Sequence, residues 1–207
     1  MENIPVKSPD KSASTRTRSR ASTARTQLDP ERWIDVAIDV LAKEGVTGLR
    51  IEVLAKRCGV TKGSFYWHFK DRQALLEAVL EHWKAGRIRD IEKTTAVTPG
   101  GEREQLLFAI DLYGANRNRK GMSIELAVRD WARHDPRAAS FVEAVDIYRL
   151  ECTRKLFVAS GMSDAEAKSR SLLLYACVFG LSLMHYGGFD DNIADLKQRI
   201  AERIVSG

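Results

Sequence analysis

The sequence predicts an all-α fold of about nine helices, with a small helical unit at the N-terminus and a larger helical unit behind it. Apolar residues recur at spacings of three and four along most of the chain from Trp33 to Ile204, which is the period of a helix with one buried face. Asp-Pro pairs, glycines and a Ser-x-x-Glu box stand where helices begin and end. No segment alternates apolar and polar residues as a half-buried strand does.

The N-terminal unit is expected to open with a long helix followed by a short one. Asp29-Pro30 supplies a capping side chain and a proline for the first helical position, so we expect a helix to begin there and to end near Glu44. A short helix is predicted over residues 51–58. Gly59, directly after it, accommodates the positive φ of a sharp turn.

A second pair of helices follows this turn. Thr61 is expected to cap a helix over residues 62–69, and Asp71 is expected to cap a longer helix that runs to about residue 92. The TPGG stretch at residues 98–101 then closes the N-terminal unit.

Helical signals continue over residues 93–207, which are predicted to form a second domain. Asp135-Pro136 repeats the start signal of the first helix, and Ser163-x-x-Glu166 is a capping box. The run over residues 171–189 carries no Asp, Glu, Lys or Arg, but its serines, histidine and glycines favour a buried or interface helix over a membrane span. A last amphipathic helix is predicted over residues 192–205.

Residues 1–28 differ in composition from the domains predicted at 29–92 and 93–207. They carry six basic residues and two acidic ones, and their Ser-, Thr- and Arg-rich part has no aromatic residue. Such a composition buries too little apolar surface to offset the entropy of ordering, so we expect disorder. Two interpretations stay open: a solvated leader, or a basic arm that settles on nucleic-acid phosphates or in a minor groove.

The two short helices around Gly59 have the layout of a helix-turn-helix, whose second helix enters the major groove of DNA. At 100° per residue, Phe65 and Phe69 share the face that packs into the core, whereas Gly63 and Trp67 point outward. A glycine at the centre of the outer face lets the helix approach base edges closely. Six basic residues against two acidic ones over positions 50–72 favour DNA phosphates as the partner.

The segment WIDVAIDVLAKEGVTGLRIEVLAKRCGVTKGSFYWHFKDRQALLEAVLEHW, residues 33–83, resembles the DNA-binding domain of the TetR family of regulators. The run GVTKGSFYWHFKDRQALL in this spacing is far more specific than a generic helix-turn-helix. ELAVRDWARHDP at residues 125–136 also resembles a subgroup of such regulators, and the rest of the second half is similar mainly in size and helix number. The resemblance implies a homodimer on a palindromic double-stranded DNA operator and a C-terminal helical domain for ligand.

The resemblance also implies which residues contact DNA. Thr61 corresponds to a cap and phosphate-binding position, and Lys70 corresponds to a lysine placed against the backbone. The start of the second helix corresponds to the base-reading segment, and the aromatic residues and histidine after it continue the contact face. The predicted DNA-binding set is Arg50, Thr61, Lys62, Gly63, Ser64, Tyr66, Trp67, His68 and Lys70.

For two members of this set, the sequence leaves two interpretations open. Arg50 departs from the family pattern, in which a small Ser or Thr precedes the second helix, so it either contacts a phosphate through its guanidinium or makes no contact. Tyr66 either continues the contact face or packs half-buried on the core.

The second domain offers candidate residues for a ligand pocket and for a dimer interface. Its aromatic residues either line an apolar cavity or fill a solid core. The pocket candidates are Trp83, Phe108, Tyr113, Trp131, Phe141 and Tyr148. A small pair one turn apart on the charge-free helix predicts an intersubunit four-helix bundle with the last helix. The interface candidates are Leu173, Ala176, Cys177, Gly180, Leu181, Met184, Leu196 and Ile200.

Other classes of protein find little support in the sequence. The three cysteines are odd in number and far apart, which fits neither a disulfide framework nor a zinc cluster and suits a reducing cytoplasm. The histidines outside the helix-turn-helix lack metal-binding pairs, and the common nucleotide-binding and hydrolase motifs are absent. We therefore expect no metal, no cofactor, no membrane span and no catalytic site.

These observations predict a cytoplasmic, sequence-specific transcriptional regulator, a repressor that a small apolar or aromatic ligand releases from its operator. The alternatives are a nonspecific or architectural DNA binder that relies on the basic arm, and a small helical enzyme. A specific repressor prefers its operator over random DNA by about 10³ or more, which an architectural binder does not, and an enzyme turns its ligand over. The sequence leaves open the effector, the operator sequence and the choice between repression and activation.

Overall fold

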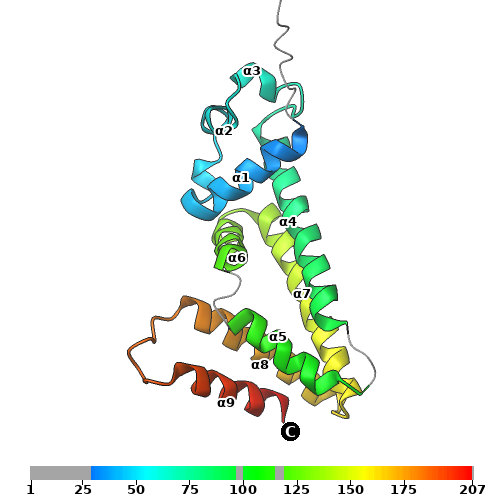
Figure 1. Cartoon of the computed structure of the whole chain (residues 1–207). Helices are drawn as coiled ribbons and strands as arrows, with labels where there is room; N and C mark the ends of the chain where they lie inside the picture. Colours follow the sequence, from blue (N-terminus) through cyan, green and yellow to red (C-terminus); the bar gives the residue numbers. More distant parts are fainter. Residues whose placement is uncertain (1–28, 97–99, 115–118, 207) are drawn as a thin grey trace, which may run out of the picture.

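The structure, a computed structural model, describes residues 29–96, 100–114 and 119–206 (Figure 1). These ranges contain nine α-helices, one short 3-10 helix and no strand, which confirms the predicted all-α class. The elements in chain order are α1 (Pro30–Glu44), η1 (Val46–Gly48), α2 (Ile51–Cys58), α3 (Lys62–Phe65), α4 (Arg72–Thr95), α5 (Glu102–Gly114), α6 (Arg119–Ala132), α7 (Pro136–Ala159), α8 (Asp164–Leu183) and α9 (Ile193–Val205). The arm predicted at residues 1–28 lies outside the described residues.

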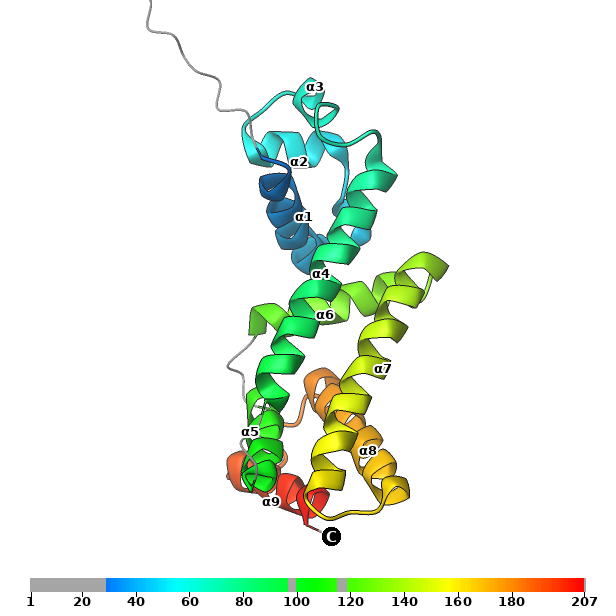
Figure 2. The same cartoon turned by 90° about the vertical axis from the view of Figure 1, so that its right-hand side faces the viewer.

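Two long helices connect the ends of an elongated molecule. Helices α1, α2 and α3 gather around the start of α4 at one end, and α5, α8 and α9 lie at the other (Figures 1 and 2). Helix α4 has 24 residues, a length of about 36 Å, and packs along α7. Helix α6 crosses between the two ends and contacts both α1 and α7. A change in the position of α6 is therefore transmitted directly to the N-terminal helices.

The expected caps form at Asp29, Asp71, Asp135 and Ser163, whereas Thr61, also expected to cap a helix, makes no side-chain capping bond. The Asp29 carboxylate accepts a hydrogen bond from Glu31 N at 3.2 Å, and the Asp71 carboxylate accepts one from Ala74 N at 2.8 Å. Asp135 caps α7 and also accepts a bond from Trp131 Nε1 at 3.0 Å, which ties the end of α6 to the start of α7. Each such cap stabilises its helix by about 1 kcal/mol.

The apolar side chains form two core clusters. The first joins the N-terminal helices to α4, α6 and α7, and in it Trp33 meets Phe65 edge to face at 5.4 Å between ring centroids. The second joins α5, α7, α8 and α9 around Phe157 and Leu174. Burying one such large side chain stabilises the fold by about 1.5–3 kcal/mol. The first cluster crosses the boundary predicted near residue 92, so the two predicted domains share packed side chains.

Two predicted helices are shorter than expected. The helix predicted over residues 62–69 is helical only at Lys62–Phe65, after which Phe65 O accepts hydrogen bonds from both His68 N and Phe69 N, each at 3.0 Å. This tight turn buries Phe69 and lets α4 begin at Arg72. The turn thus places the aromatic residues 66–69 on a compact, non-helical segment.

The charge-free helix, expected to end at Gly187 and Gly188, ends at Leu183. At the end of this helix and after it, Leu183, Met184 and Phe189 are all largely exposed, so they do not pack into a core. In the described part of the chain, no helix is long and apolar enough to cross a membrane.

Candidate functional site

The segment from α2 to the start of α4 is a helix-turn-helix whose inner face is fixed by packing. Gly59 takes a left-handed φ of 71°, and Val60 N donates to Ala55 O at 3.0 Å across the turn. Phe65 is fully buried and Phe69 nearly so, as the sequence predicted, and their rings stack 5.4 Å apart. Packing on these rings fixes the orientation of the outer face.

The outer face of α3 is open to solvent. A Cβ on Gly63 would meet only the Thr61 hydroxyl, at 3.8 Å, and the Trp67 side chain is 79% exposed. Both predictions of an outward direction are therefore confirmed. Tyr66 is 54% exposed and also meets Phe65 edge to face at 5.3 Å, so it packs on the core from the surface, and its contact with DNA stays a prediction. Flat aromatic surface beside an open glycine suits contact with the edges and sugars of a nucleic acid.

Lys62 and Glu52 pair across the helix-turn-helix. Lys62 Nζ lies 2.5 Å from Glu52 Oε1, and both side chains are more than half exposed. This hydrogen bond raises the pKa of Lys62 and lowers the pKa of Glu52. Lys62 stays charged at the surface and can exchange this exposed partner for a stronger anion or a base edge, because such pairs contribute little in water.

The remaining predicted contact residues surround this face at helix ends. Arg50 is the exposed N-cap residue of α2 and Thr61 is the N-cap residue of α3, and neither side chain makes a capping hydrogen bond. Lys70 is exposed at the turn before α4, while Ser64 and His68 are half-buried. The structure thus brings the predicted set onto one compact segment, with Ser64 and His68 at its less accessible edge.

The contacts that hold the helix-turn-helix on α4 could not be predicted from the sequence. Arg72 Nε donates to Leu49 O at 2.6 Å, and Arg72 Nη2 donates to Val46 O at 3.1 Å. Arg57 and Glu44 form an ion pair between α2 and α1. An Arg at the first position of α4 is uninformative in the sequence, because the carbonyls it meets belong to residues more than twenty positions away.

The aromatic residues predicted to line a ligand pocket mostly pack as core. Trp83 and Trp131 are almost fully buried, and Phe141 and Tyr148 pack against the same cluster. Tyr148 Oη also donates to Glu92 Oε1 at 2.9 Å, and this bond raises the pKa of Tyr148 to about 12. Phe108 is half exposed on α5. The side chain of Tyr113 lies outside the described residues.

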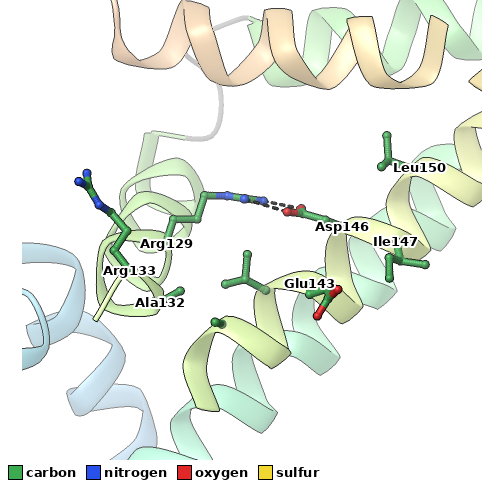
Figure 3. A pocket seen from close by; sticks show the side chains of 9 residues that line it. Arg129, Ala132, Arg133, Glu143, Asp146, Ile147 and Leu150 are labelled. Atoms are coloured by element: carbon green, nitrogen blue, oxygen red, sulfur yellow. Dashed lines mark hydrogen bonds and ion pairs between the residues drawn. The ribbon is translucent and has the colours of Figure 1, made fainter. Parts of the chain in front are cut away.

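A groove of about 410 Å³ lies instead between α6 and α7 (Figure 3). Its apolar walls come from Ala132, Ala139, Val142, Ile147 and Leu150. Four charged side chains also line it: Arg129 and Arg133 from α6, and Glu143 and Asp146 from α7. None of the predicted pocket residues lines this groove. Figure 3 shows Arg129 reaching across to Asp146, while Arg133 is turned away from it.

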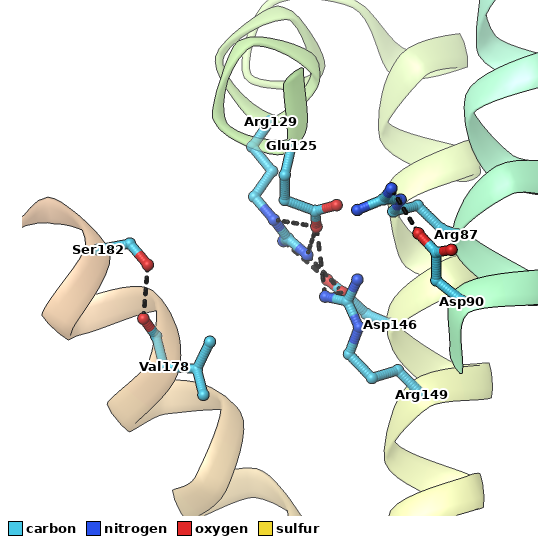
Figure 4. Close-up of polar contacts among 8 residues, drawn as sticks. All are labelled: Arg87, Asp90, Glu125, Arg129, Asp146, Arg149, Val178 and Ser182. Carbon is cyan, nitrogen blue, oxygen red and sulfur yellow. Dashed lines mark hydrogen bonds and ion pairs between the residues drawn. The ribbon is translucent and has the colours of Figure 1, made fainter. Parts of the chain in front are cut away.

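Behind this groove lies a network of buried charges (Figure 4). Arg129 donates to both carboxylate oxygens of Asp146, at 2.9 and 2.5 Å, and to Glu125 Oε1 at 3.0 and 2.8 Å. Arg149 donates to the same Glu125 oxygen at 3.2 Å and to Asp146 at 3.3 Å. Glu125 is 3% exposed and Arg149 is 2% exposed. We call these four residues the α6–α7 charge network.

The carboxylates of the charge network raise the pKa of Arg129. Burial alone would lower the pKa of Arg129, but the hydrogen bonds and charges of Asp146 and Glu125 outweigh it and raise that pKa. The Arg129 guanidinium also lies 4.1 Å from the centre of the Phe179 ring on α8. Among the described residues, Glu125 Oε2 and Arg149 Nε are buried without a hydrogen-bond partner. Hydrogen bonding within the network is thus incomplete among the described residues.

Sequence reasoning missed the charge network. The signal was present as Glu125 and Arg129 four residues apart and Asp146 and Arg149 three residues apart, a spacing that places each pair on one helix face. Most pairs of this kind lie on a solvated surface. Only the packing of α6 on α7 shows that these two pairs face each other.

The outer face of α8 carries exposed apolar side chains. Leu173 and Met184 from the predicted interface are more than half exposed, and so are Leu172 and Leu183 beside them. Nothing described lies within 4 Å of a Cβ built on Gly180. Among the other interface candidates, Ala176 is exposed, and the half-buried ones are Cys177, Leu181, Leu196 and Ile200. Apolar exposure of this extent is typical of a surface that binds a partner.

The described residues contain no group of three or more His, Cys, Asp or Glu side chains placed to hold a metal ion. Cys58, Cys152 and Cys177 are all free thiols. Burial raises the pKa values of Cys58 and Cys177, which makes these thiols less reactive than an exposed cysteine.

Comparison with known proteins relates the helix-turn-helix to one family. A family model described as bacterial regulatory proteins, tetR family, matches residues 34–79. The tetracycline repressor protein class A from transposon 1721 of Escherichia coli is 36% identical over 108 residues, which is 52% of this chain and 45% of that protein. The regulator SrpR of Pseudomonas putida is 36% identical over 62 residues, 30% of this chain and 29% of SrpR. The matches thus span less than half the length of these relatives.

Solved structures share the fold over nearly their full length. Reduced NemR of E. coli gives a TM-score of 0.71 at 17% identity, covering 86% of this chain and 97% of NemR. A transcriptional regulator from Saccharomonospora viridis, solved in complex with choline, gives a TM-score of 0.69 at 16% identity, covering 85% and 94%. These similarities confirm the arrangement of helices beyond the helix-turn-helix.

Glu125→Gln is expected to lower the free energy of unfolding by about 3 kcal/mol. The substitution keeps the shape of the side chain but leaves Arg149 buried with only the partly exposed Asp146 as a charged partner. Urea unfolding followed by tryptophan fluorescence measures the change. Asp130→Asn, an exposed site on the same helix, is the matched control and should stay within about 0.5 kcal/mol of the parent. A Glu125→Gln protein as stable as that control would contradict the structural role of the network.

Proposed function

We propose that this chain, which belongs to the TetR family of bacterial regulatory proteins through its N-terminal domain, is a sequence-specific transcriptional repressor that a small molecule releases from its operator. The observation that carries the proposal is the outer face of α3 and of the turn after it, where Gly63 and Trp67 are open to solvent above a fixed aromatic core. That arrangement presents backbone and side-chain donors to a DNA groove without any rearrangement of the helix-turn-helix.

The contacts divide into base-reading and backbone-positioning groups. Lys62, Gly63 and Trp67 occupy the outer face, so they carry the sequence preference. Thr61 and Lys70 flank that face at exposed turns and position it on phosphates. Arg50, exposed and without a capping bond, joins the phosphate-binding group.

A homodimer places two such faces on a palindromic operator. We assign the interface to the exposed apolar face of α8 together with α9, which form a four-helix bundle with their copies in the second subunit. The symmetry of this pairing sets the two α3 helices about 34–36 Å apart, one turn of DNA.

The helices behind the DNA-binding domain supply the response to an effector. A relative is named as a tetracycline repressor, and a neighbour with the same fold holds choline, so small molecules bind regulators of this architecture. Helix α4 runs from the helix-turn-helix to the far end of the molecule, and α6 contacts α1. Both helices connect ligand binding to the spacing of the α3 helices.

Selection of bound DNA from a random pool tests the proposed function. The full chain should enrich one palindromic sequence and should bind it about 10³-fold or more tightly than random DNA at physiological salt. An enrichment without sequence preference would identify an architectural binder instead. Incubation with candidate ligands, followed by recovery of each ligand unchanged, separates a sensor from an enzyme.

Gly63→Val is expected to weaken operator binding by about 1–3 kcal/mol, the range lost with one good base contact. The fold should survive, since the new side chain meets only the Thr61 hydroxyl. Fluorescence anisotropy with the selected operator measures the affinity. Gly86→Val on α4, where space is also open, is the matched control and should bind normally. Parent-like binding by Gly63→Val would show that α3 does not approach the bases.

Lys70→Ala is expected to weaken binding to all DNA sequences alike and to reduce the slope of log affinity against log salt by about 1. The reason is the loss of one phosphate contact that carries no sequence information. Lys155→Ala, at an exposed lysine on α7, controls for the change in net charge. A changed operator preference in the Lys70→Ala protein would instead make Lys70 a base-reading residue.

Gly180→Arg is expected to convert the dimer to a monomer. The new side chain introduces bulk and charge into the apolar face of α8, whereas its own subunit leaves the site open. Light scattering gives the mass of each species in solution. Ala144→Arg, at an exposed position on α7, should remain dimeric. A dimeric Gly180→Arg protein would move the interface away from this face.

A further inference from the structure

The ion pair between Arg129 and Asp146 forms the polar floor of the α6–α7 groove (Figure 3). Each terminal nitrogen of Arg129 donates to one carboxylate oxygen of Asp146, at 2.9 and 2.5 Å. This two-point geometry is the one in which a guanidinium binds any carboxylate. The walls beside it are apolar. The groove therefore combines a carboxylate-binding fork with space for an apolar body.

The two partners of this ion pair are not held equally. Arg129 also donates twice to Glu125 and stacks 4.1 Å from the Phe179 ring centre, so several contacts fix it in place. Asp146 has a side chain that is 33% exposed at the groove, and its ion pairs are to Arg129 and Arg149 alone among the described residues. Rotation of Asp146 toward solvent is thus easier than removal of Arg129.

The net charge of the α6–α7 charge network determines which kind of chemical group can replace the Asp146 carboxylate. With Asp146 in place, the charge network holds two arginines and two carboxylates and is neutral. Without the Asp146 carboxylate, Arg129 and Arg149 face Glu125 alone and one positive charge is left unbalanced. Arg149 is 2% exposed, and its Nε is buried without a partner among the described residues. An unbalanced charge at this depth is costly, so a single negative charge is required.

We propose that the effector is a monocarboxylate with an apolar body, and that its carboxylate takes the place of Asp146 on Arg129. The carboxylate binds the Arg129 fork, and the apolar body lies against Val142, Ile147 and Leu150. Asp146 acts as an internal stand-in for the ligand, which keeps the groove neutral until the ligand arrives. The inference rests on the proposed function and names the class of its effector.

Displacement of Asp146 breaks a connection between α6 and α7. Arg129 lies on α6, and the other end of that helix contacts α1, where Lys120 Nζ lies 2.9 Å from Asp39 Oδ1. A ligand that binds only when Asp146 has moved favours the conformations in which α6 is released from α7. Those conformations shift α1 and the helix-turn-helix, so the ligand lowers operator affinity.

Three small molecules of equal length test the charge requirement. Hexanoate, hexanamide and hexylammonium share an apolar chain and differ in the head group, and acetate shares the carboxylate without the chain. Calorimetric titration of the full-length protein should show binding of hexanoate, at least tenfold weaker binding of hexanamide and acetate, and no binding of hexylammonium. Preferential binding of hexylammonium, or equal binding of hexanamide, would overturn the proposal.

Three variants test the residues. Arg129→Gln should abolish hexanoate binding, whereas Arg133→Gln, at the groove arginine that turns away from Asp146, should keep it within a few fold. Asp146→Asn removes the competing charge with little change in shape, so it should bind hexanoate at least tenfold more tightly than the parent. Urea unfolding verifies that each variant is folded. Weaker binding by a folded Asp146→Asn protein would contradict the stand-in role.

Operator binding is measured in parallel, so that a failure of the effector hypothesis can be distinguished from a failure of the proposed function. Hexanoate should lower operator affinity, and operator should lower hexanoate affinity by the same factor, typically about 5–150-fold. A protein that binds its operator but not hexanoate overturns the inference and leaves the proposed function standing. A protein that binds hexanoate but selects no DNA sequence overturns the proposed function.

Discussion

The arrangement of this molecule depends on the buried ion pair between Arg149 of α7 and Glu125 of α6. Their side chains are 2% and 3% exposed, so neither charge is stabilised by water when the other is absent. Apolar side chains of similar volume would hold two helices together at least as well. A charged pair adds directional constraint, because the placement of α6 on α7 has to bring Glu125 within reach of Arg149 and Arg129 within reach of Asp146. The constraint fixes α6, and α6 supports α1.

This constraint connects the two ends of the chain by two routes of different character. Helix α4 is a continuous rod, anchored to the helix-turn-helix by Arg72 and to α7 by the bond between Tyr148 and Glu92. Helix α6 is held by apolar packing and by ion pairs to α7, one of which we propose that a ligand replaces. A continuous helix such as α4 transmits a displacement along its length. A helix held by exchangeable ion pairs, as α6 is, can take the two alternative positions that a switch requires.

The helix-turn-helix shows the opposite design, in which apolar packing fixes the surface that meets DNA. Phe65 and Phe69 fill the space under α3, and the chain turns tightly between them. The resulting face has few polar contacts of its own to break, and the exchangeable pair of Lys62 with Glu52 lies at its surface. The rigidity needed for reading bases and the mobility needed for a response therefore reside in different parts of one small chain.

The sequence alone determined where most helices begin, which aspartates and serine cap them, and the inward and outward faces of the helix-turn-helix, because these depend on neighbours three or four residues away. Asp29, Asp71 and Ser163 act within one turn of the chain, and so does the alternation of Phe65 with Gly63. Only the tertiary structure decided where the polar site of the second half lies. Glu125 and Arg149 are 24 residues apart and look like ordinary surface charges until α6 packs on α7 and excludes water from both. The same holds for the burial of Trp83 and Trp131 in one core cluster, because it depends on the packing of helices that no local pattern specifies.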